Sequence, residues 1–329
     1  MMDGPGVIVL GFDGGGTKCE AVVVDATGAV LSRGRGGPTV DWYEGAERVR
    51  ASVSQAVDEA ICGRPASFAA AVGCSPGTGA ALRSLRELVS APLFREAREY
   101  DLIRATHLED HGLVVLAGTG SFVHAQSRSG REVYLGGGGP LIGDEGSAYH
   151  IGLAGIRAAY RSDYSPTRAT SLRPRILAAL GLSHVAGIID FLYGERPGAG
   201  DRRTGIAALA RVVDEEAGAG DSVAVSIMSD AARQLGDLAV EAVYGAAMER
   251  HTFPLMPAGG VAAHSALFRE ALVAHVRNSV PGAHLLAPLL PPVVGAAFLA
   301  LRDAGVEWGP HLVANALRSE AFGLESSFD

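Results

Sequence analysis

The pattern that most constrains the fold is a three-strand unit with a glycine turn, which occurs twice along the chain. The first copy spans residues 7–34, where apolar runs are joined by the glycine-rich turn 13–16 and a tight turn. The second copy spans residues 113–135 and has its glycine turn at 118–121. Short apolar runs separated by glycine-rich turns indicate antiparallel strands. Their repetition predicts two related domains that each contain a β-meander.

Helical periodicity surrounds and follows these meanders, as expected for domains of mixed α/β type. The predicted helices span residues 46–61, 80–89, 147–161, 206–216, 222–248 and 265–280. The apolar stretch 285–301 has nearly the length of a membrane span, but three prolines interrupt it. We therefore expect it to be a loop that enters a buried helix, and we expect no association with a membrane.

Charge and cysteine content exclude several classes of protein. The 28 basic and 36 acidic residues give a net charge of -8, and no run of Lys or Arg could neutralise a row of phosphates, so we expect no nucleic-acid partner. The three cysteines, Cys19, Cys62 and Cys74, show no CxxC spacing, which suits a reducing compartment and offers no zinc site. The first apolar run is too short for a signal peptide, so we expect a cytoplasmic protein.

The two glycine turns have the composition of phosphate-binding loops. A glycine turn between strands exposes backbone N–H groups, and Thr17 and Ser121 add hydroxyl donors at matching positions. Gly11 and Gly16 have Walker A spacing, but Lys18 follows Thr17 instead of preceding it, and a strand follows the turn where a helix is required. Either turn alone would be an ordinary hairpin. The repetition favours a pair of turns that bind the phosphates of ATP.

Asp13 directly precedes the glycine run, where it would lie close to bound phosphates. A carboxylate there is costly unless Mg²⁺ bridges it to the phosphates. Asp13 is therefore a candidate metal ligand for Mg²⁺, and a turn aspartate without a ligand is the alternative.

Five motifs together resemble those of the actin/hexokinase/Hsp70-like ATPases, and specifically the BadF/BadG/BcrA/BcrD-type ATPases that include N-acetylglucosamine kinases. The motifs are GFDGGGTK at 11–18, LAGTGS at 116–121, GGGGPLIGDEGSAYHIG at 136–152, PAGGVA at 257–262 and PPVVGAAFLA at 291–300. The resemblance covers almost the whole chain. It implies an α/β fold of two related actin-like (ribonuclease H-like) ATPase domains that flank a cleft for ATP and substrate.

The resemblance also implies domain boundaries and the residues that hold ATP. We expect an N-terminal domain at 1–111, a C-terminal domain at 112–301, and a helix at about 302–329 that packs back on the first domain. Gly259 and Gly260 would lie against adenosine, and the residues of the first two motifs would hold phosphates. The cofactor-binding candidates are Gly14, Gly15, Gly16, Thr17, Lys18, Gly118, Thr119, Gly120, Ser121, Gly259 and Gly260.

In that family an aspartate before the second meander acts as general base, and the resemblance assigns this role to Asp101. Such a carboxylate takes the proton of the attacking hydroxyl and contributes about 10² to 10⁴ in rate. The family usually has Asn-Asp-Ala or Thr-Asp-Ala here, whereas this chain has Tyr100-Asp101-Leu102. A helix N-cap is the alternative role for this residue.

The resemblance places the acceptor sugar at the motif 136–152. Asp144 and Glu145 would accept hydrogen bonds from vicinal hydroxyls, and Gly137 and Gly138 would allow close approach of the backbone. The alternative is that the two acids simply begin the following helix, where negative charge is favoured.

Asp41 is a further substrate candidate. Eukaryotic N-acetylglucosamine kinases resemble this chain at 36–42 but have asparagine where Val40 falls. We hypothesise that Asp41 binds the ammonium group of glucosamine or another amino sugar, with a surface aspartate as the alternative.

The sequence therefore predicts an ATP-dependent phosphotransferase that phosphorylates a hydroxyl of a sugar, an amino sugar above others. The sequence is compatible with a homodimer. Two alternatives are a non-catalytic regulator that binds ATP or sugar, and an activator of a dehydratase, which would hold an iron–sulfur cluster through cysteines. We expect the histidine-containing segment 107–111 to be a solvated loop without a metal.

Overall fold

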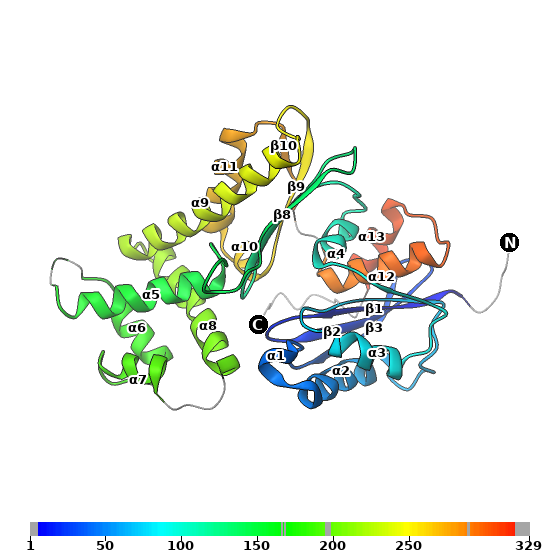
Figure 1. The fold of residues 1–329 in the computed structure, drawn as a ribbon, viewed down its shortest axis with the longest axis horizontal. Coiled ribbons are helices and arrows are strands. Elements are labelled where there is room, and N and C mark those ends of the chain that lie inside the picture. Colours follow the sequence, from blue (N-terminus) through cyan, green and yellow to red (C-terminus); the bar gives the residue numbers. More distant parts are fainter. Residues whose placement is uncertain (1–5, 166, 168, 195–198, 288–289, 320–329) are drawn as a thin grey trace. The chain divides into compact units, whose positions relative to one another are not determined.

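The computed structural model describes residues 6–165, 167, 169–194, 199–287 and 290–319 of the 329-residue chain (Figure 1). It divides into two compact units. Unit 1 consists of Met1–Asp110 and Leu289–Asp329, and unit 2 consists of His111–Pro288. Each unit has its own sheet and its own helices, and each is described separately below.

Unit 1 is built on a five-stranded sheet in the order β3-β2-β1-β4-β5. The first three strands form the predicted meander and are antiparallel, whereas β4 and β5 run parallel to β1. The strands are β1 (Ile8–Gly14), β2 (Cys19–Asp25), β3 (Val30–Gly36), β4 (Ala70–Cys74) and β5 (Leu93–Glu96). The helices are α1 (Asp41–Glu44), α2 (Ala46–Ile61), α3 (Ala80–Leu88), α4 (Glu99–Thr106), α12 (Pro292–Asp303) and α13 (Pro310–Arg318).

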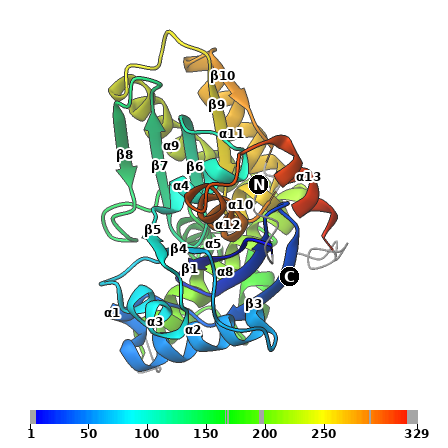
Figure 2. The same ribbon diagram turned by 90° about the vertical axis from the view of Figure 1, so that its right-hand side faces the viewer.

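Both faces of this sheet are buried, because successive residues of a strand point to opposite faces and both sets are apolar here. On β2, Val22 and Val24 pack in a core with residues of α4, α12 and α13. Ala21 and Val23, on the other face, pack in a second core with residues of α2 and α3. Figure 2 shows α12 and α2 on opposite sides of the dark blue strands.

Helix α12 packs on unit 1, which differs from the predicted boundary at residue 301. Its buried Val293, Ala297 and Leu301 belong to the core formed with β1, β2 and β4. At Gly11 of β1, an added Cβ would lie 2.5 Å from the Val293 carbonyl oxygen, so strand and helix are in close contact. Helix α12 therefore belongs to unit 1. Of the expected C-terminal helix at 302–329, residues 310–318 form α13, and residues 320–329 lie outside the described part.

Unit 2 is built on a second five-stranded sheet, in the order β10-β9-β6-β7-β8. Strands β6, β7 and β8 form the second antiparallel meander, and β9 and β10 extend the sheet in parallel. The strands are β6 (Gly112–Ala117), β7 (Ser121–Gln126), β8 (Glu132–Gly136), β9 (Phe253–Ala258) and β10 (Ala283–Leu285). The two sheets have the same order and directions when β1 is matched to β6, which confirms the predicted repeat.

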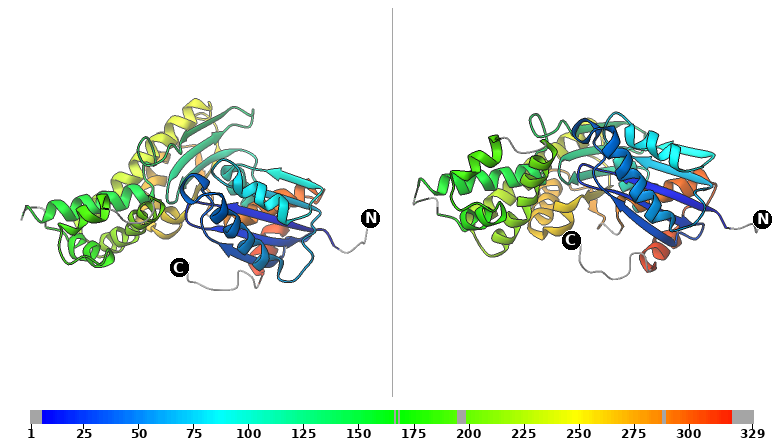
Figure 3. Two further views of the ribbon diagram at one scale, coloured as in Figure 1. Left: turned by 60° about the horizontal axis from the view of Figure 1, so that its bottom comes forward. Right: turned by 90° about the horizontal axis from the view of Figure 1, so that it is seen from below.

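The helices of unit 2 pack with one face of its sheet in a single core, which includes Val115 of β6, Val123 of β7 and Leu255 of β9. They are α5 (Ala148–Ser162), α6 (Leu172–Ala179), α7 (Gly187–Tyr193), α8 (Ala199–Gly218), α9 (Ser222–Gly245), α10 (Gly260–His264) and α11 (Ala266–Ser279). In Figure 3 the green helices α5 to α8 gather together within this unit.

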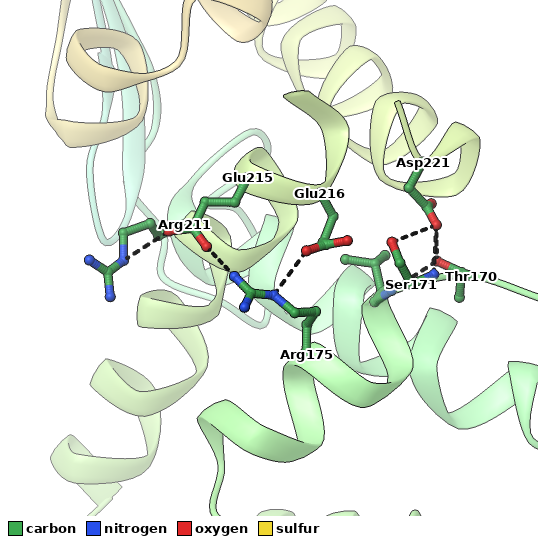
Figure 4. A network of polar contacts seen from close by, with 8 residues as sticks. Thr170, Ser171, Arg175, Arg211, Glu215, Glu216 and Asp221 are labelled. Carbon is green, nitrogen blue, oxygen red and sulfur yellow. Dashed lines mark hydrogen bonds and ion pairs between the residues drawn. The ribbon is translucent and has the colours of Figure 1, made fainter. Parts of the chain in front are cut away.

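A polar network fixes the start of α6 against α8 and α9 (Figure 4). The Asp221 carboxylate caps α9 by accepting from two N–H groups of its first turn, and it also accepts from Thr170 and Ser171 just before α6. Arg175 of α6 contacts Glu215 at 2.6 Å and Glu216 at 2.9 Å, both on α8. Exposed pairs of this kind add little stability singly, so we assign the network to orientation of α6.

All six predicted helices and six predicted strands are present, with small differences at their ends. The sequence did not predict the short helices α1, α4, α6, α7 and α10. None of the helices in the described ranges combines the length and apolar character needed to cross a membrane.

Candidate functional site

The turn between β1 and β2 presents backbone donors to solvent. The Gly15 N–H donates to the Lys18 carbonyl at 2.9 Å, and the Gly15 carbonyl accepts from the Thr39 N–H at 3.0 Å. The N–H groups of Gly16 and Thr17, at the tip, donate to no residue that the structure describes. An added Cβ on Gly14 would lie 2.5 Å from Thr39 Oγ1, so only glycine fits there. The contacts with Thr39 thus fix the turn, while the N–H groups at its tip have no acceptor among the described residues.

Three cationic side chains lie beside this turn around one buried carboxylate. Glu20 of β2 pairs with Arg33, with Arg35 at 3.1 Å and with Lys18 at 3.5 Å. Burial would raise the pKa of Glu20, but the charges of Arg33 and Lys18 outweigh it and hold that pKa below its ordinary value. The Lys18 side chain is 57% exposed, so its charge is accessible to solvent at the turn.

The turn between β6 and β7 has the same open tip. The carbonyls of Gly118 and Thr119 accept hydrogen bonds from the first N–H groups of α5, at 2.8 and 3.3 Å. Among the described residues, none accepts from the N–H groups of Thr119 or Gly120. Both hairpins therefore leave two adjacent N–H groups free, which is the arrangement that binds anions.

Asp144 fixes the second turn through a hydrogen bond from Ser121. Its carboxylate accepts from the Ser121 N–H at 3.1 Å and from Arg203 at 3.3 Å, and the side chain is buried. It also packs against Gly120, where an added Cβ would lie 2.7 Å from its Oδ1 atom. The neighbouring Glu145 accepts at its main-chain carbonyl from Ser121 Oγ, at 2.7 Å. Asp144 thus has partners within the protein, unlike a carboxylate kept free for sugar hydroxyls.

The first glycine of the pair after β9, Gly259, lies against the same turn. At Gly259 an added Cβ would lie 2.5 Å from the Ala117 carbonyl oxygen and 2.8 Å from the Gly118 nitrogen. Gly259 has a φ of 86°, which glycine adopts without strain, and α10 begins at Gly260. Pairing of β9 with β6 brings about this contact, since Ala258 is in register with Leu116. Two motifs more than a hundred residues apart in sequence thus meet.

A pair of half-buried carboxylates lies at the edge of the unit 1 sheet where β1, β4 and β5 end. Asp13 is near the end of β1, and Glu99 is the first residue of α4, which follows β5. Burial, then the charges of Glu99 and Glu20, raise the pKa of Asp13 well above its ordinary value, and Lys18 lowers it. Burial raises the pKa of Glu99 to about 7. Sequence reasoning missed Glu99, although its place at the start of the helix that follows a parallel strand was a usable signal.

Asp101 has a different environment from the one expected of a general base. Its carboxylate accepts from the Arg98 N–H at 3.2 Å and from Arg104 Nη2 at 2.7 Å. The Arg104 side chain is 4% exposed, so Asp101 is the counter-charge of a buried guanidinium. These contacts fit the alternative role that the sequence left open, in which Asp101 stabilises the start of the helix.

Asp41 also has a structural role. It accepts from the Thr78 N–H at 3.0 Å, from Thr78 Oγ1 at 2.5 Å and from the Ala80 N–H at 3.4 Å, at the start of α3. Burial would raise the pKa of Asp41, but these hydrogen bonds lower it below its ordinary value. This carboxylate joins α1 to α3 and is not held ready for an ammonium group.

The remaining candidates lie in or near glycine-rich loops. Gly137 and Gly138 follow β8, and the Gly137 N–H donates to the Ser121 carbonyl at 2.9 Å. Ligand atoms of Glu109, Asp110 and His111 lie within 4.8 Å of one another, before the start of β6. The glycine turn 118–121 is at the other end of β6, so this cluster is separate from it.

The sequence matches the model of the BadF/BadG/BcrA/BcrD ATPase family over residues 10–300. It is 30% identical over 264 residues to the N-acetylmuramic acid/N-acetylglucosamine kinase of Clostridium acetobutylicum, covering 77% of this chain and 85% of that protein. It is 27% identical over 317 residues to the N-acetyl-D-glucosamine kinase of Dictyostelium discoideum, covering 90% and 98%. A solved structure from Porphyromonas gingivalis, provisionally named an N-acetylglucosamine kinase, superposes with a TM-score of 0.69 at 21% identity, covering 90% and 99%. The fold is thus the two-domain actin-like fold.

Proposed function

Because this chain belongs to the BadF/BadG/BcrA/BcrD ATPase family, we propose that it is an ATP-dependent kinase that phosphorylates a hydroxyl of an amino sugar. One structural observation carries the proposal. Each of the two β-hairpins has a glycine turn whose tip leaves two adjacent N–H groups without an acceptor among the described residues. Such groups bind phosphate oxygens through oriented backbone dipoles.

The residues of unit 1 would hold phosphates and the cation. Gly16 and Thr17 donate through the backbone, and Lys18 adds a charge at the same turn. Asp13 fits Mg²⁺, because its carboxylate has no hydrogen-bond donor among the described residues and hard oxygen ligands suit that ion. When bound, Mg²⁺ would neutralise negative charge on the phosphates.

The residues of unit 2 would hold phosphates and adenosine. Thr119 and Gly120 donate through the backbone, with Asp144 fixing the turn from below. Gly259 lies against the same turn without a side chain, and an added Cβ on the neighbouring Gly260 would meet nothing within 4 Å in the described part of the chain, which supports a role for the pair beside the nucleotide.

For the acceptor we propose an N-acetylhexosamine in preference to a cationic sugar. Both curated relatives described above are named kinases of N-acetylated sugars. The argument for an ammonium group depended on Asp41, whose carboxylate is committed to Thr78 and Ala80. Glu145, with Gly137 and Gly138, is proposed to contact the sugar.

We propose a cytoplasmic location, where ATP is abundant. All three cysteines are free thiols, with Cys19 and Cys74 buried and Cys62 exposed, which suits a reducing compartment.

The test is a comparison of kcat/KM for N-acetylglucosamine, N-acetylmuramic acid, glucosamine and glucose at saturating ATP. We expect one of the N-acetylated sugars to have the highest value. A preference for glucosamine would overturn the proposed acceptor, and ATP turnover that no sugar stimulates would overturn the kinase.

A further inference from the structure

The glycine turn 118–121 of unit 2 adjoins a buried ion pair. Asp144 pairs with Arg203 of α8, with 3.3 Å between Oδ2 and Nη2. Both groups reach the turn itself, because a Cβ added to Gly120 would lie 2.7 Å from Asp144 Oδ1 and 3.1 Å from Arg203 Nη2. The Asp144 side chain is 4% exposed and that of Arg203 is 19% exposed. The pair therefore lies within contact distance of the backbone that is proposed to bind phosphate.

The backbone before α5 commits Asp144 to this position. Its φ of 62° lies in the left-handed region, which residues other than glycine adopt only where their surroundings hold them there. The Asp144 carbonyl accepts from the Ser147 N–H at 3.1 Å, and its carboxylate accepts from the Ser121 N–H at 3.1 Å. These contacts hold a carboxylate against the glycine turn.

Close packing of α5 and α8 brings Arg203 to the same place. A Cβ added to Gly152 of α5 would lie 1.9 Å from the Ile206 carbonyl oxygen of α8, so only glycine allows this approach of the two helices. Arg203 is three residues before Ile206 on α8, and residues three apart lie on the same face of a helix. The contact thus places a guanidinium beside Asp144, although the two residues are 59 positions apart in the sequence.

An unbalanced carboxylate at this position would oppose the binding of phosphate. The residues Gly118, Thr119 and Gly120 of the turn have no charged side chain. A carboxylate that is withdrawn from water repels a nearby anion more strongly than one in bulk solvent, because the surrounding protein screens charge less well. In the described part of the chain, Arg203 is the cation that pairs with Asp144. Its charge therefore removes most of the repulsion that a bound phosphate would meet.

The turn between β1 and β2 in unit 1 has the same arrangement, built from different residues. Glu20 lies beside that turn with a side chain that is 7% exposed, and it pairs with Arg33 and Arg35 of β3. In unit 1 the arginines come from the neighbouring strand, whereas in unit 2 the arginine comes from a helix. Each turn thus has a buried carboxylate with an arginine partner, which indicates a shared requirement of the two turns.

We propose that Arg203 is a positioning residue for the nucleotide. Its charge neutralises Asp144 beside the turn, so that the N–H groups of Thr119 and Gly120 can bind the phosphates of ATP. Arg203 acts through Asp144 and the turn, without contacting the nucleotide. This inference rests on the kinase function proposed above, and it extends the role of Asp144, which fixes the turn without repelling phosphate only while it has this counter-charge.

The binding of ATP–Mg²⁺ and of adenosine, measured by calorimetry without sugar, tests the proposal. Arg203→Gln leaves the charge of Asp144 unbalanced, so the Kd for ATP–Mg²⁺ should rise by about ten- to a hundredfold. The Kd for adenosine should change by less than about twofold, because adenosine has no phosphate. Arg211→Gln is the matched control on the same helix. Its side chain is 86% exposed and lies 3.8 Å from Glu215, so both Kd values should stay within about twofold.

Two further variants separate the charge of Arg203 from its packing. Arg203→Lys keeps the charge and should bind ATP–Mg²⁺ within about fivefold of the wild type. The double variant Asp144→Asn/Arg203→Gln removes both charges, and the Asn oxygen can still accept from the Ser121 N–H. Its Kd for ATP–Mg²⁺ should therefore return to within about fivefold of the wild type. These two variants decide the matter if Arg203→Gln alone does not fold.

Three results would overturn the assignment while leaving the kinase intact. The first is an Arg203→Gln variant that binds ATP–Mg²⁺ as the wild type does. The second is an equal loss of affinity for ATP–Mg²⁺ and adenosine, which would show a purely structural role. The third is a double variant that binds ATP–Mg²⁺ no better than Arg203→Gln, because Arg203 would then contact phosphate directly. A wild-type protein that binds no ATP would overturn the proposed function, and the role of Arg203 with it.

Discussion

Replacing Glu99 with Gln should make the protein more stable at high pH. A pKa of about 7 in the folded state, against 4.5 ordinarily, means that the folded protein binds more protons than the unfolded chain between these values. The contribution of Glu99 to the free energy of unfolding is therefore fully present below pH 4.5 and is lost as pH rises through 7. At 1.36 kcal/mol per pKa unit the loss is at most about 3.4 kcal/mol.

Neighbouring groups titrate together with Glu99, so the single-group figure sets only the scale. Burial raises the pKa of Asp13 on β1 and of the Cys74 thiol on β4, and the charge of Glu99 raises both further. We therefore expect Glu99→Gln to gain about 1 to 3 kcal/mol over the wild type at pH 8 and almost nothing at pH 4.5. For a unit of this size that is a rise in Tm of about 2 to 10 °C.

Tryptophan fluorescence is the assay for this prediction, because both tryptophans, Trp42 and Trp308, belong to unit 1. Thermal unfolding of the wild type and of Glu99→Gln would be followed at pH 4.5, 6 and 8. Asp101→Asn is the control, and it should be less stable than the wild type at pH 8 because it removes the charge from the 2.7 Å contact with the buried Arg104. A Glu99→Gln protein that is no more stable at pH 8 than the wild type would refute the claim that burial raises the pKa of this carboxyl.

Three further substitutions test the site. Gly120→Ala would place a Cβ 2.7 Å from Asp144 Oδ1 and displace the turn, so ATP affinity measured by calorimetry should fall by about tenfold or more. The control is Gly218→Ala, where an added Cβ meets none of the described residues within 4 Å and the ATP affinity should be unchanged. Lys18→Ala should weaken ATP binding by about two- to fivefold and change stability by less than about 0.5 kcal/mol, because Lys18 is 57% exposed and Glu20 keeps its pairs with Arg33 and Arg35. Asp41→Asn should cost about 1 kcal/mol of stability in urea unfolding through the weakened start of α3, and a changed preference between glucosamine and N-acetylglucosamine would contradict its structural role.

The sequence predicted those parts of the fold that depend on local pattern. Glycine turns between apolar runs predicted both meanders, and their recurrence predicted the repeat, whereas the parallel strands β4, β5, β9 and β10 that complete the matched order were not predicted. The assignment of α12 to unit 1 was not predictable in the same way. Val293 to Leu301 is apolar on every side, so periodicity does not indicate which sheet the helix covers.

The site residues show the same division between local and long-range information. The open tips of the two phosphate turns follow from glycine content, which is local. Asp41 could not be assigned, because its partner Thr78 is 37 residues away. Glu99 could not be found from local pattern, because only the strand order β1-β4-β5 shows that the helix after β5 begins at the edge where β1 ends.

The central claim is that this protein transfers the γ-phosphoryl group of ATP to an amino sugar. Its most direct test is the stoichiometry of products after incubation with ATP, Mg²⁺ and N-acetylglucosamine, read by ³¹P NMR. The account predicts one sugar phosphate monoester for each ADP formed, with little ADP when the sugar is omitted. ADP formed together with inorganic phosphate, and without a phosphomonoester of any amino sugar, would contradict it.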